Sequence, residues 1–549
     1  MKFSAVIIVA FAFGQVGVQE VKEQGLALFD QAELTVKQES DPARLAHGAL
    51  VLASLIKDIE ASRGEALLRL AARALSKLDF IAEQGQAGGM PRVTFRSPYD
   101  VDRLWEKLFE ESAELRVELV REFLAEVKAD DRWKGVLLAR LARSVREARA
   151  MEELVELSLA HAVSFSAVSL LFDLRGRDPE RGRAIFRAAL ERAVRRGDLD
   201  GLYWLGAYAI PGVNLPNRFP LTDPPAPDPV LARVYIRALV DVLSQVAVWA
   251  NPMPAHIYRA LVNIRPHAER FAPDRVPQID SLLAFVTSRL SPRAIAEAEQ
   301  RDLERVSPET EKIEDLELRA QLARDEKIHD DLMARAAYLA LTGKDFERAL
   351  RLAAKLKDRG VRAELRDLIH LRAAAELSER GQWEHAAEQA LAIEQPERLA
   401  VAVAGVLQKL SDKDRAALLI AQAQARIERL QTSAAKGRAF LYLAGPVMSF
   451  DVDQGRFLLS RAIEMFNATR ADLNGAREAA IRIETGDFAT GSVVGSYDLS
   501  SVVIEAFKKL AKADPELIQA LPLAARWESA EIRAIAQAAI ARSLLERVR

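Results

Sequence analysis

The sequence of 549 residues predicts an all-α protein in which antiparallel helical hairpins stack into an α-solenoid, with irregular loops rich in proline and glycine. Three observations support this fold class. Helix-start signals recur along the chain, apolar residues follow them at spacings of three and four, and one junction pattern recurs at intervals of 43 and 37 positions. No comparable stretch alternates apolar and polar residues with period two, so we expect almost no β-strand.

Six dipeptides mark expected helix starts. Asp or Ser can cap the N–H groups of the first helical turn, and Pro at the first helical position has no N–H to leave unsatisfied. The dipeptides are Asp41-Pro42, Asp178-Pro179, Asp228-Pro229, Ser291-Pro292, Ser307-Pro308 and Asp514-Pro515. Acidic residues follow three of them, at Glu180, Glu309 and Glu516, where they favour the positive end of the helix dipole.

Four segments share the pattern of a helix–turn–helix junction. Each has an apolar residue that ends one helix, a polar cap two positions later and an alanine that opens the next buried face. The segments are Ile313–Ala320, Leu356–Ala363, Ile393–Ala400 and Trp527–Ala534. Because one hairpin of this size cannot bury its apolar stripe alone, neighbouring hairpins are expected to stack.

A second mark lies at the other turn of each hairpin. Phe346 and Trp383 are 37 positions apart, each is followed by Glu, and each comes shortly after a glycine, Gly343 or Gly381. These glycines are expected to end the preceding helix in the left-handed conformation. One repeat is therefore predicted to be a helix, a glycine turn, a helix that opens with an aromatic residue, and a short polar turn.

This Gly-x-(x)-[Phe/Trp]-Glu-x-Ala junction resembles the repeats of the tetratricopeptide-like superfamily of α-solenoids, although the spacing exceeds their usual length. The resemblance covers residues 300–420 and, in part, the stretch to Arg549. The chain also resembles exported helical-repeat proteins of bacteria, a likeness that implies no activity. Solenoids of this superfamily commonly bind peptides or other proteins in a concave groove, so the resemblance implies a protein or peptide partner.

The N-terminus has the pattern of a secretory signal peptide covering residues 1–14. Lys2 supplies the positive charge, the run from Phe3 to Phe13 is apolar, and small residues follow at the expected cleavage site. The alternative is a buried N-terminal helix. No later segment reaches the length of a membrane span without charges, so we expect an exported protein, periplasmic or secreted, with no transmembrane segment after cleavage.

Breaks in composition suggest how the rest of the chain is divided. The predicted parts are an N-terminal helical region (15–210), a proline-rich loop (211–229), a middle helical region (230–300) and a region of tetratricopeptide-like hairpin repeats (301–549). A further irregular loop is expected at 484–498, where Gly, Ser and Thr are frequent. Its Phe488, Ser492, Ser496 and Tyr497 form a secondary candidate site, against the simpler interpretation of a connection between hairpins.

Composition and motifs argue against several classes of function. The 77 basic and 79 acidic residues nearly balance, so a nucleic-acid partner is not expected. The absence of cysteine excludes disulfides and thiolate chemistry. No catalytic residue, cofactor or metal is predicted, since no zinc-protease helix, nucleophile elbow or phosphate loop occurs. His329 beside Asp330 and Asp331 could touch a metal, but a solvated helix cap is the favoured interpretation.

One aromatic cluster is the first candidate for a ligand or partner site. Tyr203, Trp204 and Tyr208 precede the proline-rich loop, and Trp249 and Tyr258 flank a short turn nearby. These rings could line a pocket partly covered by the loop. The alternative is that they fill the core where helices diverge around that loop.

Together these observations predict a non-enzymatic interaction or scaffold protein of the bacterial cell envelope or extracellular space, which binds its partner in a solenoid groove. One alternative is an all-α enzyme acting on polysaccharide or peptidoglycan, which would need two buried carboxylates converging beside Tyr203 and Trp204. Another alternative is a structural protein that assembles with itself.

Overall fold

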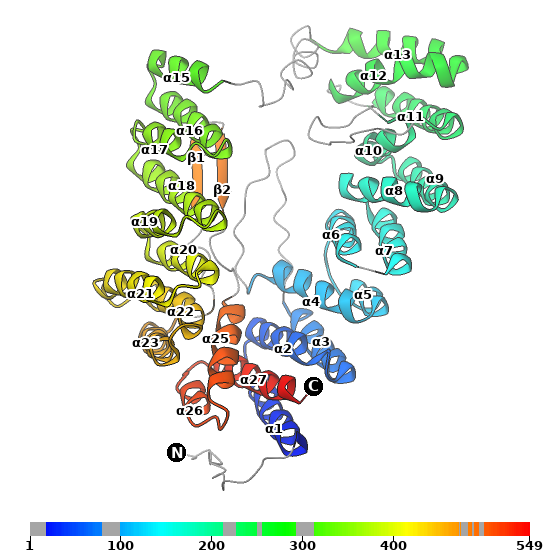
Figure 1. Cartoon of the computed structure of the whole chain (residues 1–549). Coiled ribbons are helices and arrows are strands. Elements are labelled where there is room, and N and C mark those ends of the chain that lie inside the picture. The colour runs from blue at the N-terminus through cyan, green and yellow to red at the C-terminus, as the bar shows by residue number, and fades with distance from the viewer. Residues whose placement is uncertain are drawn as a thin grey trace. The chain divides into compact units, whose positions relative to one another are not determined.

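The computed structural model describes residues 18–78, 99–145, 147–211, 227–249, 255–291, 312–471, 473, 481–485, 488–492 and 499–548, and helices fill most of them (Figure 1). The chain forms two compact units. One combines Met1–Leu115 with Lys312–Arg549, and the other is Arg116–Glu311. Among the described helices, none has the length and apolar character that a membrane span requires.

The first unit contains most of the described helices and one two-stranded sheet. Its helices are α1 (Val18–Lys37), α2 (Pro42–Ile56), α3 (Ala61–Leu75), α4 (Val101–Leu115), α15 (Ile313–Leu322), α16 (Glu326–Thr342), α17 (Phe346–Ala353), α18 (Arg359–Glu379), α19 (Trp383–Ala392), α20 (Pro396–Lys409), α21 (Lys413–Glu428), α22 (Ala434–Met448), α23 (Val452–Thr469), α25 (Ser500–Ala513), α26 (Ala520–Ala525) and α27 (Ala530–Arg547). Strands β1 (Ile481–Thr485) and β2 (Phe488–Ser492) pair antiparallel.

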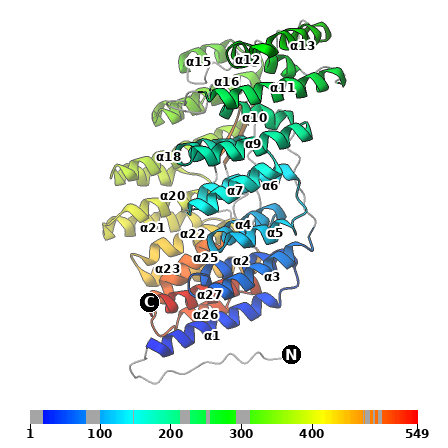
Figure 2. The same cartoon turned by 90° about the vertical axis from the view of Figure 1, so that its right-hand side faces the viewer.

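These helices form two rows that alternate along the chain. We call the row that carries the β-hairpin the inner row; it runs through α16, α18, α20, α22, α25, α27, α2 and α4. From α18 onward each of these helices packs on the next, and β1 packs on both α16 and α18. The other row consists of α15, α17, α19, α21, α23, α26, α1 and α3. Figures 1 and 2 show the successive layers. The prediction of a stacked all-α solenoid is confirmed.

The two ends of the chain meet inside this stack, because α27 packs against both α1 and α2. The approach is close: a Cβ built on Gly25 of α1 would lie 2.8 Å from Cγ of Leu545. The buried carboxylate of Glu531 contacts Nδ1 of the buried His47 and accepts a hydrogen bond from the hydroxyl of Tyr99 at 2.7 Å. The stack therefore runs from α15 through α27 and continues into α1–α4.

Buried carboxylates join successive hairpins at their turns. Asp330, near the start of α16, accepts the backbone N–H groups of Lys357 and Asp358 at 2.9 and 2.8 Å. Asp367 occupies the equivalent place 37 positions later and accepts the N–H of Glu394 at 3.0 Å. Each carboxylate thus accepts backbone N–H groups of the turn that leads into the next inner-row helix.

Basic side chains satisfy carbonyl groups at helix ends in the same way. In the first unit, Nη2 of Arg426 donates to the carbonyl of Ile393 at 3.0 Å, and Lys436 donates to two carbonyls of the turn before α22. Charged side chains therefore hold the turns of neighbouring hairpins together, where the helix ends leave polar backbone groups without intrahelical partners.

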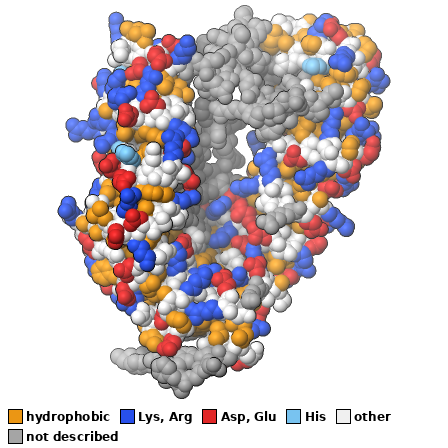
Figure 3. Space-filling view, viewed as in Figure 1, with side chains coloured by type: hydrophobic (Ala, Val, Ile, Leu, Met, Phe, Trp, Pro, Cys, Tyr) orange, Lys and Arg blue, Asp and Glu red, His pale blue; other side chains and the backbone are white. Residues whose placement is uncertain are grey.

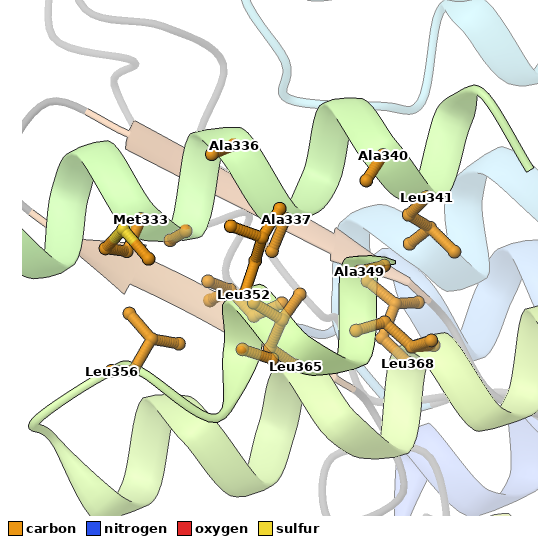
Figure 4. Packing of buried hydrophobic residues seen from close by; sticks show 14 of the residues in the cluster. Met333, Ala336, Ala337, Ala340, Leu341, Ala349, Leu352, Leu356, Leu365 and Leu368 are labelled. Carbon is orange, nitrogen blue, oxygen red and sulfur yellow. The ribbon is translucent and has the colours of Figure 1, made fainter. Parts of the chain in front are cut away.

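Small residues let the helices of adjacent hairpins approach closely. Ala336 and Ala340 of α16 and Ala349 of α17 are buried in one cluster with leucines such as Leu352 and Leu368 (Figure 4). The contact of small with large side chains fills the space between three successive helices without charged groups.

The second unit is also a stack of helices. Its elements are α5 (Val117–Leu124), α6 (Asp131–Ser144), α7 (Ala148–His161), α8 (Phe165–Arg177), α9 (Pro179–Arg196), α10 (Leu199–Ala209), α11 (Pro229–Trp249), α12 (Ala255–Phe271), a 3₁₀ turn (Pro273–Arg275) and α13 (Val276–Arg289). Helix α6 packs on α8 and α8 on α10, while α7 packs on α9 and α9 on α11. Basic side chains again bond to helix ends: Arg192 to the carbonyl of Leu159, and Arg196 to that of His161.

Four of the six predicted helix starts lie in the described part of the chain, and three of these are confirmed. Asp41, Asp178 and Asp228 each accept N–H groups from the first turn of α2, α9 and α11. Ser291-Pro292 and Ser307-Pro308 include residues outside the described part. The prediction is wrong at Asp514-Pro515, because Leu517 adopts a left-handed φ of 57° and Asp514 instead accepts N–H groups at the start of α26.

The aromatic starts at Phe346 and Trp383 are confirmed as the first residues of α17 and α19. Gly381 has the expected left-handed φ of 72°, but Gly343 does not; Lys344 takes that conformation, with φ of 62°. Lys344 lies 37 positions before Gly381, so the left-handed residue occupies the same place in both repeats. In the first repeat the glycine comes one position before that residue. The expected loop at 484–498 is also corrected in part, since β1 and β2 extend into it.

The structure divides the chain differently from the predicted regions. The segment treated as one N-terminal region (15–210) is split between the two units after Leu115, and its first helices belong with the C-terminal repeats. Packing of α27 on α1 and α2 accounts for this arrangement. The predicted signal peptide and most of the proline-rich loop lie outside the described residues.

The joint between the chain ends can be tested with Gly25→Val. We expect this change to lower the free energy of unfolding by about 1–3 kcal/mol, because the added side chain must displace Leu545. Urea unfolding followed by circular dichroism measures the difference. Gly405→Ala is the matched control: a Cβ there meets nothing within 4 Å, so it should raise stability by about 0.5–1 kcal/mol. If the Gly25→Val variant is as stable as wild type, α1 does not pack on α27 as closely as described.

The turn carboxylates can be tested with Asp330→Asn. Burial raises the pKa of Asp330, but the N–H groups of Lys357 and Asp358, together with His329, outweigh burial and hold the pKa below its usual value. Its contribution to stability is therefore present above the unfolded-state value, about 3.9, and is lost as the pH falls through the lower folded-state value.

At pH 7 we expect Asp330→Asn to cost about 1–3 kcal/mol, since the amide accepts hydrogen bonds less well than the carboxylate. The difference from wild type should narrow in unfolding experiments below about pH 4. Asp325→Asn is the control, because Asp325 caps α16 through the N–H of Lys327 and asparagine caps helices about equally well. If Asp330→Asn lowers the free energy of unfolding at pH 7 no more than Asp325→Asn does, the carboxylate of Asp330 does not stabilise the turn.

Candidate functional site

Tyr208, in the middle of the predicted aromatic cluster, is a core residue. Its ring is fully buried and stacks on Phe186 of α9, with centroids 5.1 Å apart, and it contacts Phe172 of α8 at 5.3 Å. The guanidinium of Arg175 lies 5.7 Å from the ring centroid. The ring therefore fills the space between α8, α9 and α10, as the alternative interpretation of the cluster expected.

Tyr203 and Trp204 are less buried than Tyr208 and lie next to each other. Both are half-buried on α10, and their rings meet edge to face with centroids 5.2 Å apart. Tyr258 is half-buried on α12, and the side chain of Trp249 lies outside the described part. The structure thus brings Tyr203 and Trp204 together and places Tyr208 in a separate contact with Phe172 and Phe186.

Two tyrosine hydroxyls of this unit, those of Tyr208 and Tyr235, are buried. Burial raises the pKa of Tyr208 and also that of Tyr235 on α11. Neither hydroxyl has a hydrogen-bond partner among the described residues. The Tyr208 oxygen lies so close to α9 that a Cβ on Gly182 would be 2.9 Å away, so the helix packs directly against it.

The described part of this unit places no buried acidic side chain beside the aromatic pair. Besides the two tyrosines, Ser158 is the single buried polar side chain described there, and it donates to the carbonyl of Gly135 at 2.6 Å. Across the described residues of the whole chain, no cluster of His, Cys, Asp or Glu is arranged to hold a metal ion. His329 instead contacts Asp330 at 2.9 Å, beside the turn that Asp330 caps.

A second surface emerges in the first unit, where β1 crosses α16 and α18 (Figure 1). Its residues alternate: Ile481, Ile483 and Thr485 are buried, while Arg482 and Glu484 are exposed. Ile481 and Ile483 belong to the same buried cluster as the leucines and alanines of α16–α18. We call the surface of α16 and α18 under β1 the strand-binding face.

Polar contacts fix the position of β1 on the strand-binding face. The backbone N–H of Arg482 donates to Oε2 of Glu364 on α18 at 3.3 Å, and the hydroxyl of Thr485 lies 3.5 Å from Oδ1 of Asp331 on α16. Glu364 is itself held by Arg398, which also pairs with the buried Asp367. The face therefore combines an apolar surface with a positioned acceptor for a backbone N–H, the two features by which proteins hold extended peptides.

The hairpin reaches this face from a distant part of the chain. Glu364 and Arg482 are 118 positions apart, and the hairpin lies within the connection between α23 and α25. Burial of two isoleucines contributes about 3–6 kcal/mol. Fixing the backbone of the strand opposes this gain, because each ordered residue costs about 1–2 kcal/mol of conformational entropy. The hairpin is therefore held on this face by a small number of apolar contacts.

Sequence analysis missed the strand-binding face, although one signal was present. The run Ile-Arg-Ile-Glu-Thr at 481–485 alternates with period two, which is typical of a half-buried strand. The glycine-rich residues after it suggested a loop. Of the four residues proposed there, Phe488 and Ser492 fall in β2, and Ser496 and Tyr497 lie outside the described part.

Charge does not single out another surface on the face seen in Figure 3, where acidic and basic side chains are interspersed. Many of them form pairs within or between helices, such as Arg335 with Asp331 and Arg351 with Glu347. This mixed pattern matches the interleaving of charges along the sequence.

Comparison with known proteins adds little to this picture. No protein-family model matches the chain, and no curated protein matches it. Among solved structures, it is similar to a circular tandem repeat protein "with novel repeat topology and enhanced subunit contact surfaces", at 12% identity over 97% of this chain and 98% of that chain, with a TM-score of 0.12. At that TM-score the likeness carries no structural argument, and the repeat character rests on the chain's own helices.

The assignment of Tyr208 to the core can be tested with Tyr208→Phe. Because the hydroxyl is buried without a partner, its removal should leave stability unchanged or raise it by about 1 kcal/mol. Thermal unfolding measures the effect, and Tyr203→Phe serves as a half-buried control with little expected change. A clear loss of stability in Tyr208→Phe would mean that the hydroxyl has a partner, and would restore Tyr208 as a candidate binding residue.

Proposed function

We propose that this chain is a non-enzymatic interaction or scaffold protein of the bacterial cell envelope, exported by its N-terminal segment, and that it binds a segment of a partner protein along the inner row. Stacked helical hairpins are in general an architecture of scaffold and interaction proteins, because repetition builds long continuous surfaces. The envelope location is supported by the apolar run after Lys2 and the small residues that follow it.

One observation carries the proposal for the inner row: α16 and α18 already hold an extended segment. Ile481 and Ile483 are buried against these helices, and Glu364 accepts a backbone N–H of the same strand. These contacts recognise extended polypeptide with alternating apolar residues and need no particular exposed side chain. A row of helices that accepts such a segment from its own chain has the chemistry to accept one from a partner.

The proposal can be tested by photo-crosslinking from the two rows. The full chain would carry a photoreactive phenylalanine at position 335 on α16 or at position 351 on α17. Arg335 and Arg351 each form an i,i+4 ion pair on its own helix, and Arg351 is the more exposed of the two, so lack of an adduct at position 351 cannot result from poor access. After irradiation with the envelope fraction, we expect an adduct with one protein from position 335 and none from position 351. The adducts are identified by mass spectrometry.

Purified partner must then bind the purified wild-type chain directly. Equal adducts from both positions, or none from either, would contradict binding along the inner row. The same capture with Tyr203→Ala/Trp204→Ala reports on the half-buried aromatic pair of the second unit. Loss of the partner from this folded double variant, with no adduct at position 335, would move the site to α10.

A further inference from the structure

We infer that the β1–β2 hairpin is an internal occupant of the strand-binding face, and that the partner is an extended protein segment that replaces it. This inference rests on the proposed function and specifies its site, the chemistry of the partner and the competition that regulates binding. Its basis is that an occupant is seen on the face, held by the contacts of β1 given above.

The contacts of β1 define what a replacing segment must carry. Two aliphatic side chains are needed at alternating positions, where Ile481 and Ile483 are buried. The residue between them must have a free backbone N–H for Glu364, which excludes proline there. A donor side chain two residues after the second aliphatic residue would meet Asp331, as the hydroxyl of Thr485 does. β-branched residues suit these positions because the segment must be extended.

The hairpin can leave the strand-binding face without disturbing the contacts between the stacked helices. The inner row continues from α22 to α25 and α27 by direct packing, so the helices joined by this connection do not need the hairpin for their own contacts. Within the described part, the sheet has two strands of five residues, and such a hairpin is marginal without support. The few contacts that hold it are ones that a segment of another protein can make in its place.

A second copy of this chain is a poorer occupant. The hairpin of another copy would bring its own α16 and α18 with it. A single extended segment avoids this difficulty, because it brings no helices. The contacts therefore favour a flexible segment of a different protein.

The inference predicts that weakening the hairpin strengthens binding in trans. The probe is a fluorescein-labelled peptide that copies residues 479–487, measured by fluorescence anisotropy against the full chain. Ile483→Asp should undock the hairpin without changing α16 or α18, and should increase peptide affinity by about ten- to a hundredfold over wild type. Arg482→Pro is the second variant; it removes the N–H that Glu364 accepts and should raise affinity by a smaller factor.

The face itself is tested in the Ile483→Asp background. Adding Glu364→Ala should reverse much of the gain, whereas Glu394→Ala should not, because Glu394 pairs with Arg366 away from β1. A peptide with aspartate in place of its second isoleucine should bind none of the variants. Helix content by circular dichroism confirms that each variant is folded. If Ile483→Asp does not fold, the comparison is made with Arg482→Pro alone.

Two results would overturn the inference. Unchanged affinity in both hairpin variants would mean that the hairpin does not compete for the face. Reduced affinity would mean that the peptide adds to the hairpin rather than replacing it. Because this assay uses purified chain and a defined peptide, it can fail while a partner still crosslinks at position 335. The proposed function fails separately, if no partner crosslinks to the inner row.

Discussion

The structure depends on one constraint: a helical hairpin of about 37 residues cannot bury its apolar face except against another hairpin. Each end of the chain would therefore leave an exposed face. In the first unit this problem is solved by packing α27 on α1 and α2, so that the two ends of the chain cover each other. Glycine at position 25 and the buried contact between His47 and Glu531 make this joint as close as the joints elsewhere in the stack.

The same constraint explains why charged residues are buried in an otherwise alanine- and leucine-rich stack. Each hairpin adds turns whose backbone groups lie between neighbours, away from water, and charged side chains from the adjacent hairpin satisfy them. Asp330 and Asp367 do this for N–H groups, and Arg426 does so for carbonyls. An inner row built in this way is a fixed surface, and the β-hairpin shows that this surface accepts extended polypeptide.

Local chemistry made part of this structure predictable. Capping at Asp41 and Asp178 and the aromatic starts of α17 and α19 are visible in sequence, because each depends on residues within one turn. The joint of the chain ends depends on side chains 484 positions apart, for which no local signal exists. Sequence could not separate Tyr208 from Tyr203 either, since burial of a ring depends on helices that pack from elsewhere. The strand at 481–485 was hidden by the glycines that follow it.

The most direct test of the continuous stack is hydrogen–deuterium exchange of the intact chain, compared between α1 and α27. If the two ends cover each other, the backbone amides of α1 exchange as slowly as those of α27, and Gly25→Val speeds exchange in both helices together. If α1 instead exchanges like a frayed terminal helix while α27 stays protected, the ends are not joined, and the arrangement of the first unit described above is wrong.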